Sequence, residues 1–391
     1  MASAESKPAG ASRLLYLDNI RTLLIASVIL GHMAMTYGAE GDWYYKETGQ
    51  GSDIAFLLFL PLAAVGVAFM MGLFFLLAGY FTPRACDRKG AGRFLLDRLV
   101  RLGIPFLFYQ VVINPLLYYA LDTHKGSFRG SLWQFLPGYI RSRDSFGDGP
   151  VWFLEALLIF CAFYALWRAA VRSAPRCEGE GSADRRPPGN GAIALFALGL
   201  GVATFVARMW ATVGVSYEPC HLELARFPQF AAMFAAGIAA YRRKWLESFT
   251  DAQARLWRWV VLLFVLLLPA LAIASGALTG TLDERAAGGL NGLSLAYSMW
   301  EAFMGVSMII TVLFWFRKRF NRQGRLARAM SQGTFAAYVL HPAIIIPLAL
   351  ALSGIQMNLG LKFILVAPVA VALCFAVGYY VRQLPLARSV L

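Results

Sequence analysis

Long apolar segments recur along the whole chain, separated by shorter stretches rich in charged and turn-forming residues. A helix needs about 20 mainly apolar residues to cross the hydrocarbon core of a bilayer. Ten windows fit this requirement, approximately 14–37, 54–80, 102–121, 150–170, 192–213, 225–241, 257–276, 288–316, 330–352 and 360–381. The pattern predicts an all-α integral membrane protein, a bundle of about ten transmembrane helices. The window 225–241 is short and bordered by arginines, so its limits are the least well defined.

Composition and charge agree with a membrane protein and argue against a nucleic-acid partner. The 391 residues are 59% hydrophobic and 15% charged, which is too apolar for a soluble globular protein. The net charge of +14 would suit a nucleic-acid-binding protein. However, if the N-terminus is cytoplasmic, 26 of the 36 Lys and Arg residues fall in cytoplasmic segments. This is the positive-inside pattern, and it predicts that both termini are cytoplasmic and that the partner of the surface is the lipid bilayer.

The polar stretches predict a simple domain organisation. Residues 1–13 are predicted to be a disordered cytoplasmic N-terminus, 14–385 a single membrane domain and 386–391 a cytoplasmic tail. The charged, proline-rich loop 171–191 is predicted to be a flexible cytoplasmic linker. The first window is longer than a signal peptide and carries an arginine, so we expect a retained anchor. The five cysteines show no CxxC or zinc spacing, so no metal site is expected.

The first apolar window carries ionisable residues. It reads YLDNIRTLLIASVILGHMAMTY and contains Asp18, Arg21 and His32. Ionisable groups at membrane depth are costly, and they usually mark functional sites. Eleven residues at about 100° each make roughly three helical turns, so Arg21 and His32 share a face and lie about 16 Å apart along the axis. The window therefore offers a polar face whose partners must come from other helices.

The second window ends in GLFFLLAGYF, where Gly72, Ala78 and Gly79 permit close approach of a neighbouring helix. Pro83 is expected to stop this helix.

A basic amphipathic helix is predicted between the second and third windows. In RFLLDRLVRLGIPFLFY, Arg93, Arg98 and Arg101 accompany an apolar stripe, and the helix is expected to lie at the cytoplasmic surface and turn near Pro105. Positive-inside topology and attraction to anionic lipid would account for the arginines. Alternatively, they bind the phosphates of a cytoplasmic donor, since guanidinium groups bind phosphate well.

The fourth window opens with a tryptophan and a carboxylate on one face. Glu155 lies three residues after Trp152, just inside the membrane. A carboxylate there needs a partner, and Arg208 and Arg226 lie at a similar predicted depth. A structural ion pair and a catalytic carboxylate are both consistent with this pattern.

Further candidate residues come from later windows and external loops. His221 falls in the external loop GVSYEPCHLEL, and Glu301 lies in the middle of the window 288–316, where it needs a cavity or a donor. Tyr338 and His341 share a face in MSQGTFAAYVLHPAII, and His341 is either a hydrogen-bonded core residue or part of a polar cavity. The first external loop contains Trp43 among other aromatics, which form an interfacial belt or contact a polar acceptor such as a sugar.

Several stretches, taken together and in order, resemble the membrane-bound acyltransferase-3 family, the O-acetyl- and O-acyltransferases of bacterial envelope polysaccharides and related glycans. LDNIR followed by GH gives the family's pattern of arginine, ten residues and histidine on Arg21 and His32. GLFFLLAGYF, RFLLDRLVRLGIPFLFY and SQGTFAAYVLHP continue the resemblance, which covers about 14–385. One departure is the fourth window, where the family often has a longer spacing between tryptophan and glutamate.

The resemblance implies an acyl-CoA donor on the cytoplasmic side of a bacterial cytoplasmic membrane and a carbohydrate or glycan hydroxyl on the other side. It implies that His32 is the general base and that Arg21, oriented by Asp18, stabilises the thioester oxyanion or holds CoA. An acyl-His32 intermediate is the other order of events. The acyl group is expected to be acetyl or succinyl. The residues assigned to catalysis are His32, Arg21, Asp18 and Glu155, those assigned to the donor are Arg93, Arg98 and Arg101, and those assigned to the acceptor are Trp152, Arg208, His221, Glu301, Tyr338 and His341.

Two other functions compete with acyl transfer. A polar face through a bundle of helices, with carboxylates in mid-membrane, would also serve a transporter or flippase for an anionic or glycan-like solute. A membrane scaffold or sensor would leave the charges within the membrane without a role.

Overall fold

The computed structural model describes residues 14–49, 52–142, 149–171, 186–217, 222–276 and 284–390. The predicted N-terminus 1–13 and most of the predicted linker 171–191 lie outside these ranges. The described residues are mainly helical, with one isolated antiparallel bridge between Tyr217 and Leu222. This agrees with the predicted all-α fold.

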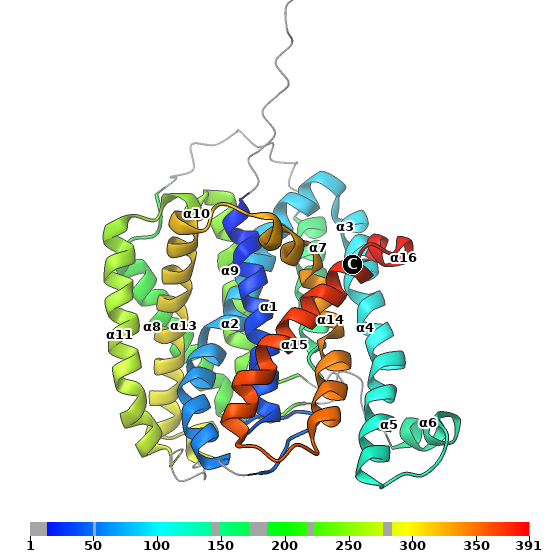
Figure 1. Cartoon of the computed structure of the whole chain (residues 1–391). Helices are drawn as coiled ribbons and strands as arrows, with labels where there is room; N and C mark the ends of the chain where they lie inside the picture. Colours follow the sequence, from blue (N-terminus) through cyan, green and yellow to red (C-terminus); the bar gives the residue numbers. More distant parts are fainter. Residues whose placement is uncertain are drawn as a thin grey trace, which may run out of the picture.

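Nine helical segments of the described residues are long and apolar enough to cross a membrane. Eight of them are formed by α1 (Leu15–Thr36), α2 (Ser52–Lys89), α7 (Trp152–Ala170), α8 (Asn190–Arg208), α11 (Asp251–Ala274), α13 (Gly292–Arg319), α14 (Arg325–Leu352) and α15 (Leu359–Val381). The ninth is the continuous segment Ala91–Lys125, which comprises α3 (Ala91–Arg98), α4 (Ile104–Phe108) and α5 (Asn114–Lys125). The short sixth window, 225–241, corresponds to α9 (Phe227–Arg243), which has 17 residues and runs among the longer helices (Figure 1).

The remaining helical elements are short. They are α6 (Leu132–Arg141), α10 (Trp245–Ser248), α12 (Glu284–Ala287), α16 (Pro385–Val390) and a 3₁₀ turn at Leu224–Arg226. Figure 1 shows the start of α1 at the same end of the bundle as α3, α10 and α16, with α6 at the opposite end. The start of α1 and the helix α16 therefore lie at one end of the bundle, and the assignment of this end to the cytoplasm stays a prediction.

Two local predictions about proline are wrong. Pro83 does not stop a helix, because α2 continues to Lys89. The segment that contains Arg93 and Arg101 does not leave the surface by turning at Pro105 but runs on to Lys125. Two π-helical stretches, Leu99–Gly103 and Tyr109–Ile113, join its three α-helical parts, and a proline follows each of them. The wider π turns accommodate prolines that lack the N–H of a regular helix.

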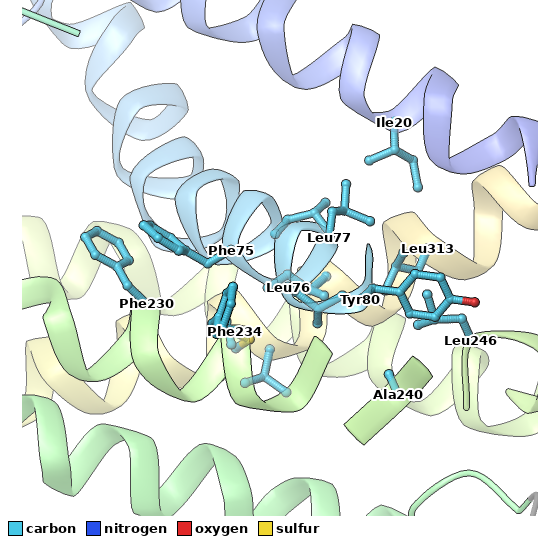
Figure 2. Packing of buried hydrophobic residues seen from close by; sticks show 14 of the residues in the cluster. Ile20, Phe75, Leu76, Leu77, Tyr80, Phe230, Phe234, Ala240, Leu246 and Leu313 are labelled. Atoms are coloured by element: carbon cyan, nitrogen blue, oxygen red, sulfur yellow. The ribbon is translucent and has the colours of Figure 1, made fainter. Parts of the chain in front are cut away.

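Close contact between α2 and α9 holds the centre of the bundle together. A Cβ at Gly79 would overlap the carbonyl oxygen of Phe234, and a Cβ at Gly237 would overlap that of Leu76. Glycine is therefore required on both helices, as the small residues near the end of the second window predict. Figure 2 shows Phe75 of α2 beside Phe230 of α9, whose rings stack with centroids 4.6 Å apart. This contact fixes α2, which forms one wall of the cavity described next.

Candidate active site

A cavity of about 1170 Å³ lies between α1, α2, the segment Ala91–Lys125, α7 and α14. Its volume slightly exceeds the roughly 300–1000 Å³ of typical small-molecule sites. Most of its wall is apolar, and a few polar or aromatic side chains interrupt it, including Arg21, His32, Arg98, Arg101, Trp152, Thr334 and Tyr338. The cavity thus gathers polar and aromatic residues of the first, fourth and ninth predicted windows, together with arginines of the predicted amphipathic helix, into one site.

Arg21 and His32 both line this cavity, as their shared helical face predicts. Their separation of eleven positions corresponds to about 16 Å along α1. Arg21 lies in the second turn of the helix and its side chain is 47% exposed. Asp18, one turn before it, is 4.0 Å away from the guanidinium, at the limit of an ion pair. The cavity therefore extends from a basic end at Arg21 toward an imidazole near the other end of α1.

Three guanidinium groups line the basic end of the cavity. Arg98 and Arg101 extend from the segment Ala91–Lys125 and join Arg21 there. The guanidinium of Arg98 stacks on the ring of Phe94 at 5.1 Å, and its Nε is buried without a hydrogen-bond partner among the described residues. Arg101 is 3.4 Å from the carboxylate of Asp97. Guanidinium donors in this arrangement suit a phosphate or another anion.

Arg93 is placed differently from the other two arginines of its segment. It is exposed and is not among the residues that line the cavity. Its predicted contact with the donor stays a prediction, and the geometry favours Arg98 and Arg101 for that role.

At the other end of the cavity, His32 forms a hydrogen bond with a second histidine. The Nδ1 of His32 is 2.9 Å from the Nε2 of His341, and the Nδ1 of His341 is 2.6 Å from the backbone oxygen of Tyr338. His341 is fully buried behind His32, whereas the ring of Tyr338 lines the cavity and its hydroxyl donates to the backbone oxygen of Pro150. This hydrogen bond joins two candidate site residues, one from the first predicted window and one from the ninth.

The first loop covers His32 with an aromatic ring. The indole of Trp43 stacks on the imidazole of His32, with centroids 4.0 Å apart and planes within 6°. The indole N–H donates to Oγ1 of Thr36 at 3.1 Å, and this hydroxyl donates to the backbone oxygen of His32. Trp43 is thus part of the site. Its position in an aromatic loop had left open whether it belongs to an interfacial belt or contacts the acceptor.

A buried ion pair anchors this loop to α15, and sequence reasoning missed it. The ammonium of Lys362 donates to Glu47 at 2.5 Å and to the backbone oxygens of Leu352 and Ile355. Both charged side chains are at least nine-tenths buried. A lysine near the start of an otherwise apolar window was the available signal. Beside this pair, burial and the Glu47 carboxylate raise the pKa of Tyr45 above its ordinary value.

Trp152 and Glu155, both on α7, differ in whether they line the cavity. Trp152 lines it and also stacks on Phe230 of α9 at 5.6 Å. Glu155 is not among the lining residues. Arg208 and Arg226 were the candidate partners of Glu155, but both form ion pairs with Glu301.

Arg208, Arg226 and Glu301 form a separate buried network that does not line the cavity. The Arg208 side chain is fully buried, donates to Glu301 and to Ser298 Oγ, and lies over the ring of Tyr297. Arg226 donates to the other oxygen of Glu301 at 2.5 Å. Arg226 also donates to Glu223 at 2.8 Å, so two carboxylates balance the two guanidinium groups, and the network ties α8, the 3₁₀ turn Leu224–Arg226 and α13 together.

Two further points concern the predicted site. His221 lies outside the described residues. Among the described residues, no three His, Cys, Asp or Glu side chains gather in a way that could hold a metal ion.

Comparison with known proteins identifies a family. A family model described as an acyltransferase domain matches residues 14–382, which is nearly the whole chain and includes every residue that lines the cavity except Val390. No curated protein and no solved structure matches the chain.

Proposed function

The chain belongs to the acyltransferase family whose model it matches, and from this membership and the cavity we propose that it moves an acyl group from acyl-CoA to a hydroxyl of a carbohydrate or glycan. The observation that carries the proposal is that one cavity contains both an arginine cluster and an imidazole. The arginines suit the phosphates of the donor, and the imidazole suits activation of the acceptor.

The two ends of the cavity supply different parts of the reaction. Arg98 and Arg101 hold the phosphates of CoA by charge-assisted hydrogen bonds. Arg21 lines the same basic end of the cavity, where it helps to hold the donor or stabilises negative charge on the thioester oxygen. Asp18 restrains Arg21 from one turn away. The apolar wall excludes water, which limits hydrolysis of the thioester.

His32 acts as the general base in the transfer step. It takes the proton of the acceptor hydroxyl while the hydroxyl oxygen forms a bond to the acyl carbon. The carbon–sulfur bond then breaks, and the CoA thiolate leaves with the proton that His32 returns. The products are an ester and free CoA. The alternative, in which the acyl group first forms a bond with His32, uses the same residue as nucleophile.

The donor and acceptor follow from the family resemblance. Acetyl is the first choice of acyl group and succinyl the second. The arginine end of the cavity lies at the end of the bundle where α1 starts, which the charge distribution predicts to be cytoplasmic. The family resemblance implies that the membrane is a bacterial cytoplasmic membrane. The acceptor then approaches His32 from the opposite side of the membrane.

Transfer of radiolabel from acetyl-CoA into envelope glycans tests the proposal. Membranes containing equal amounts of wild type or His32→Ala are compared, and His124→Ala is the matched control because His124 does not line the cavity. We expect the His32 variant to lose at least about 100-fold in rate, the lower part of what a general base contributes. The control keeps the wild-type rate.

Equal incorporation by wild type and His32→Ala would remove His32 from catalysis. No incorporation by either protein with acetyl-CoA and then succinyl-CoA would favour the transporter. In that case, uptake of solute into proteoliposomes without an acyl donor is the decisive observation.

A further inference from the structure

We propose that His341 is a positioning residue that holds His32 in the tautomer in which Nε2 is the catalytic base. The proposal rests on the proposed function for the role of His32, and it adds which nitrogen reacts and what selects it. His341 itself does not line the cavity, so it acts only through His32.

The arrangement begins with the proline after His341. In an α-helix the carbonyl of residue 338 accepts from the N–H of residue 342, but residue 342 is proline and has no N–H. The carbonyl of Tyr338 is therefore left without its regular helical donor at a buried position. The imidazole of His341, one turn along the same helix, fills this place, with its Nδ1 2.6 Å from the carbonyl oxygen. The sequence Tyr338-Val-Leu-His-Pro342 thus builds the contact locally.

This contact determines the tautomer of His341. A carbonyl oxygen only accepts hydrogen bonds, so the Nδ1 of His341 must carry a hydrogen. In the neutral imidazole the other nitrogen, Nε2, is then an acceptor. That nitrogen is the one that lies 2.9 Å from Nδ1 of His32. A hydrogen bond between them therefore requires His32 to donate from Nδ1.

The tautomer of His32 follows in turn. With its hydrogen on Nδ1, neutral His32 has its lone pair on Nε2. The planes of the two imidazoles lie within 3° of each other and their centroids are 5.0 Å apart, so the rings meet edge to edge as an in-plane N–H···N bond needs. His32 lines the cavity, and Nε2 is the nitrogen that remains available to a hydroxyl there.

The same bond supports the charged form of His32. When Nε2 takes the proton of the acceptor hydroxyl, His32 becomes an imidazolium and its bond from Nδ1 becomes charge-assisted, which strengthens it. His341 needs no proton change in this step because its Nε2 already accepts. The proton that His32 takes from the hydroxyl is returned to the CoA thiolate, so protons and charge balance without His341. A base oriented by a third group is a general feature of acyl-transfer sites.

Two substitutions separate orientation from simple filling of space. Gln at position 341 has an amide oxygen that accepts from His32 and an amide N–H that donates to the Tyr338 carbonyl, whereas Leu has neither. We expect His341→Leu to lower kcat by about 10- to 100-fold, the range for removing the partner that orients a functional histidine. The KM for acetyl-CoA should stay the same, because the arginines are distant along the cavity. His341→Gln should recover most of the lost kcat.

A direct measurement of the tautomer complements the kinetics. The chain has four histidines, so labelling with ¹⁵N-histidine gives few signals, and the His32 signal is identified by its loss in His32→Gln. In the intact protein in lipid, we expect His32 to carry hydrogen on Nδ1, and His341→Leu to give a mixture of tautomers. Hydrogen on Nε2 in the wild type would overturn the inference whether or not transfer is detected.

The two proposals can fail separately. If wild type transfers label and His32→Ala does not, but His341→Leu keeps the wild-type kcat, the positioning role is wrong and the proposed function stands. If wild type shows no transfer but the tautomer is as expected, the hydrogen-bonded chain is supported and the proposed reaction is wrong. Equal losses of kcat in His341→Leu and His341→Gln, with both proteins folded, would also contradict the positioning role.

Discussion

Two polar centres of the described bundle, one at His32 and one at Glu301, differ in what surrounds them. His32 hydrogen-bonds to His341 and stacks on Trp43, yet it still lines a large cavity. Glu301 instead accepts from two arginines in a compact network whose members do not line that cavity. The first centre presents a polar group to a ligand, whereas the second uses its polar groups on one another.

The difference shows why an ionisable residue in a membrane helix is not by itself evidence of a catalytic role. Burying a charge is costly, and either function or a complementary partner can retain it. Access to the cavity separates the two cases. Measurements of stability and kinetics test whether the His32 centre is catalytic and the Glu301 centre structural.

Glu301→Gln should have the largest effect on stability. The substitution leaves the buried guanidinium groups of Arg208 and Arg226 without their shared carboxylate, and breaking a buried ion pair in this way costs about 3–5 kcal/mol. Chemical unfolding in mixed micelles measures the loss. Asp251→Asn is the matched control because its ion pair with Lys318 is exposed, and it should show no measurable change. An unchanged free energy of unfolding in Glu301→Gln would contradict the structural role.

Lys362→Met should loosen the loop that carries Trp43. It removes the partner of Glu47 and the donor to two backbone oxygens, at a cost of about 3 kcal/mol, the lower end for a broken buried pair. Limited proteolysis in the loop 37–49, together with unfolding measurements, detects the change. Adding Glu47→Gln should restore part of the stability, since the unpaired carboxylate is then removed. Strictly additive losses would show that the two residues are not coupled.

Arg98→Ala should weaken donor binding without affecting the fold. Loss of one charged hydrogen-bond donor costs about 1.5–3 kcal/mol, which corresponds to roughly a 10- to 100-fold rise in the KM for acyl-CoA. Arg93→Ala is a close control, since it removes the same charge from the same segment at an exposed position outside the cavity. Equal KM values for the two variants would mean that the arginines act through topology or lipid binding.

Trp43→Ala should give the smallest effect. The stacked indole contributes about 0.5–1.5 kcal/mol to holding the His32 ring, so kcat should fall by roughly 2- to 10-fold. Trp43→Phe keeps a ring over the imidazole but lacks the N–H that bonds Thr36, and it should lie between wild type and Trp43→Ala. Equal rates in all three proteins would exclude a role for the stacking.

The sequence predicted most of the fold because helices in lipid must satisfy their own backbone groups and be long enough to cross. It failed at Pro83 and Pro105, since the effect of a proline depends on whether π turns and neighbouring helices compensate for the lost hydrogen bond. The close approach at Gly79 could be anticipated from residue size. Its partner, Gly237, could not, because the choice of neighbouring helix is a property of the whole bundle.

The candidate site was predictable only in part. The spacing of Arg21 and His32 on one helix was enough to place both on one face. Pairing between distant windows could not be read from spacing, so the bonds of Arg208 to Glu301 and of His32 to His341 emerged only from the structure. Lys362 escaped attention because the side chain of a single lysine near the start of an apolar window usually reaches the membrane interface.

The central claim is that the His32 centre performs the reaction and the Glu301 centre holds the bundle together. The most direct test is the rate of acyl transfer per folded molecule for His32→Ala and Glu301→Gln, purified in lipid and compared with wild type. The account predicts a loss of at least about 100-fold for His32→Ala and nearly the wild-type rate per folded molecule for Glu301→Gln. A fully active His32→Ala, or a folded but inactive Glu301→Gln, would contradict it.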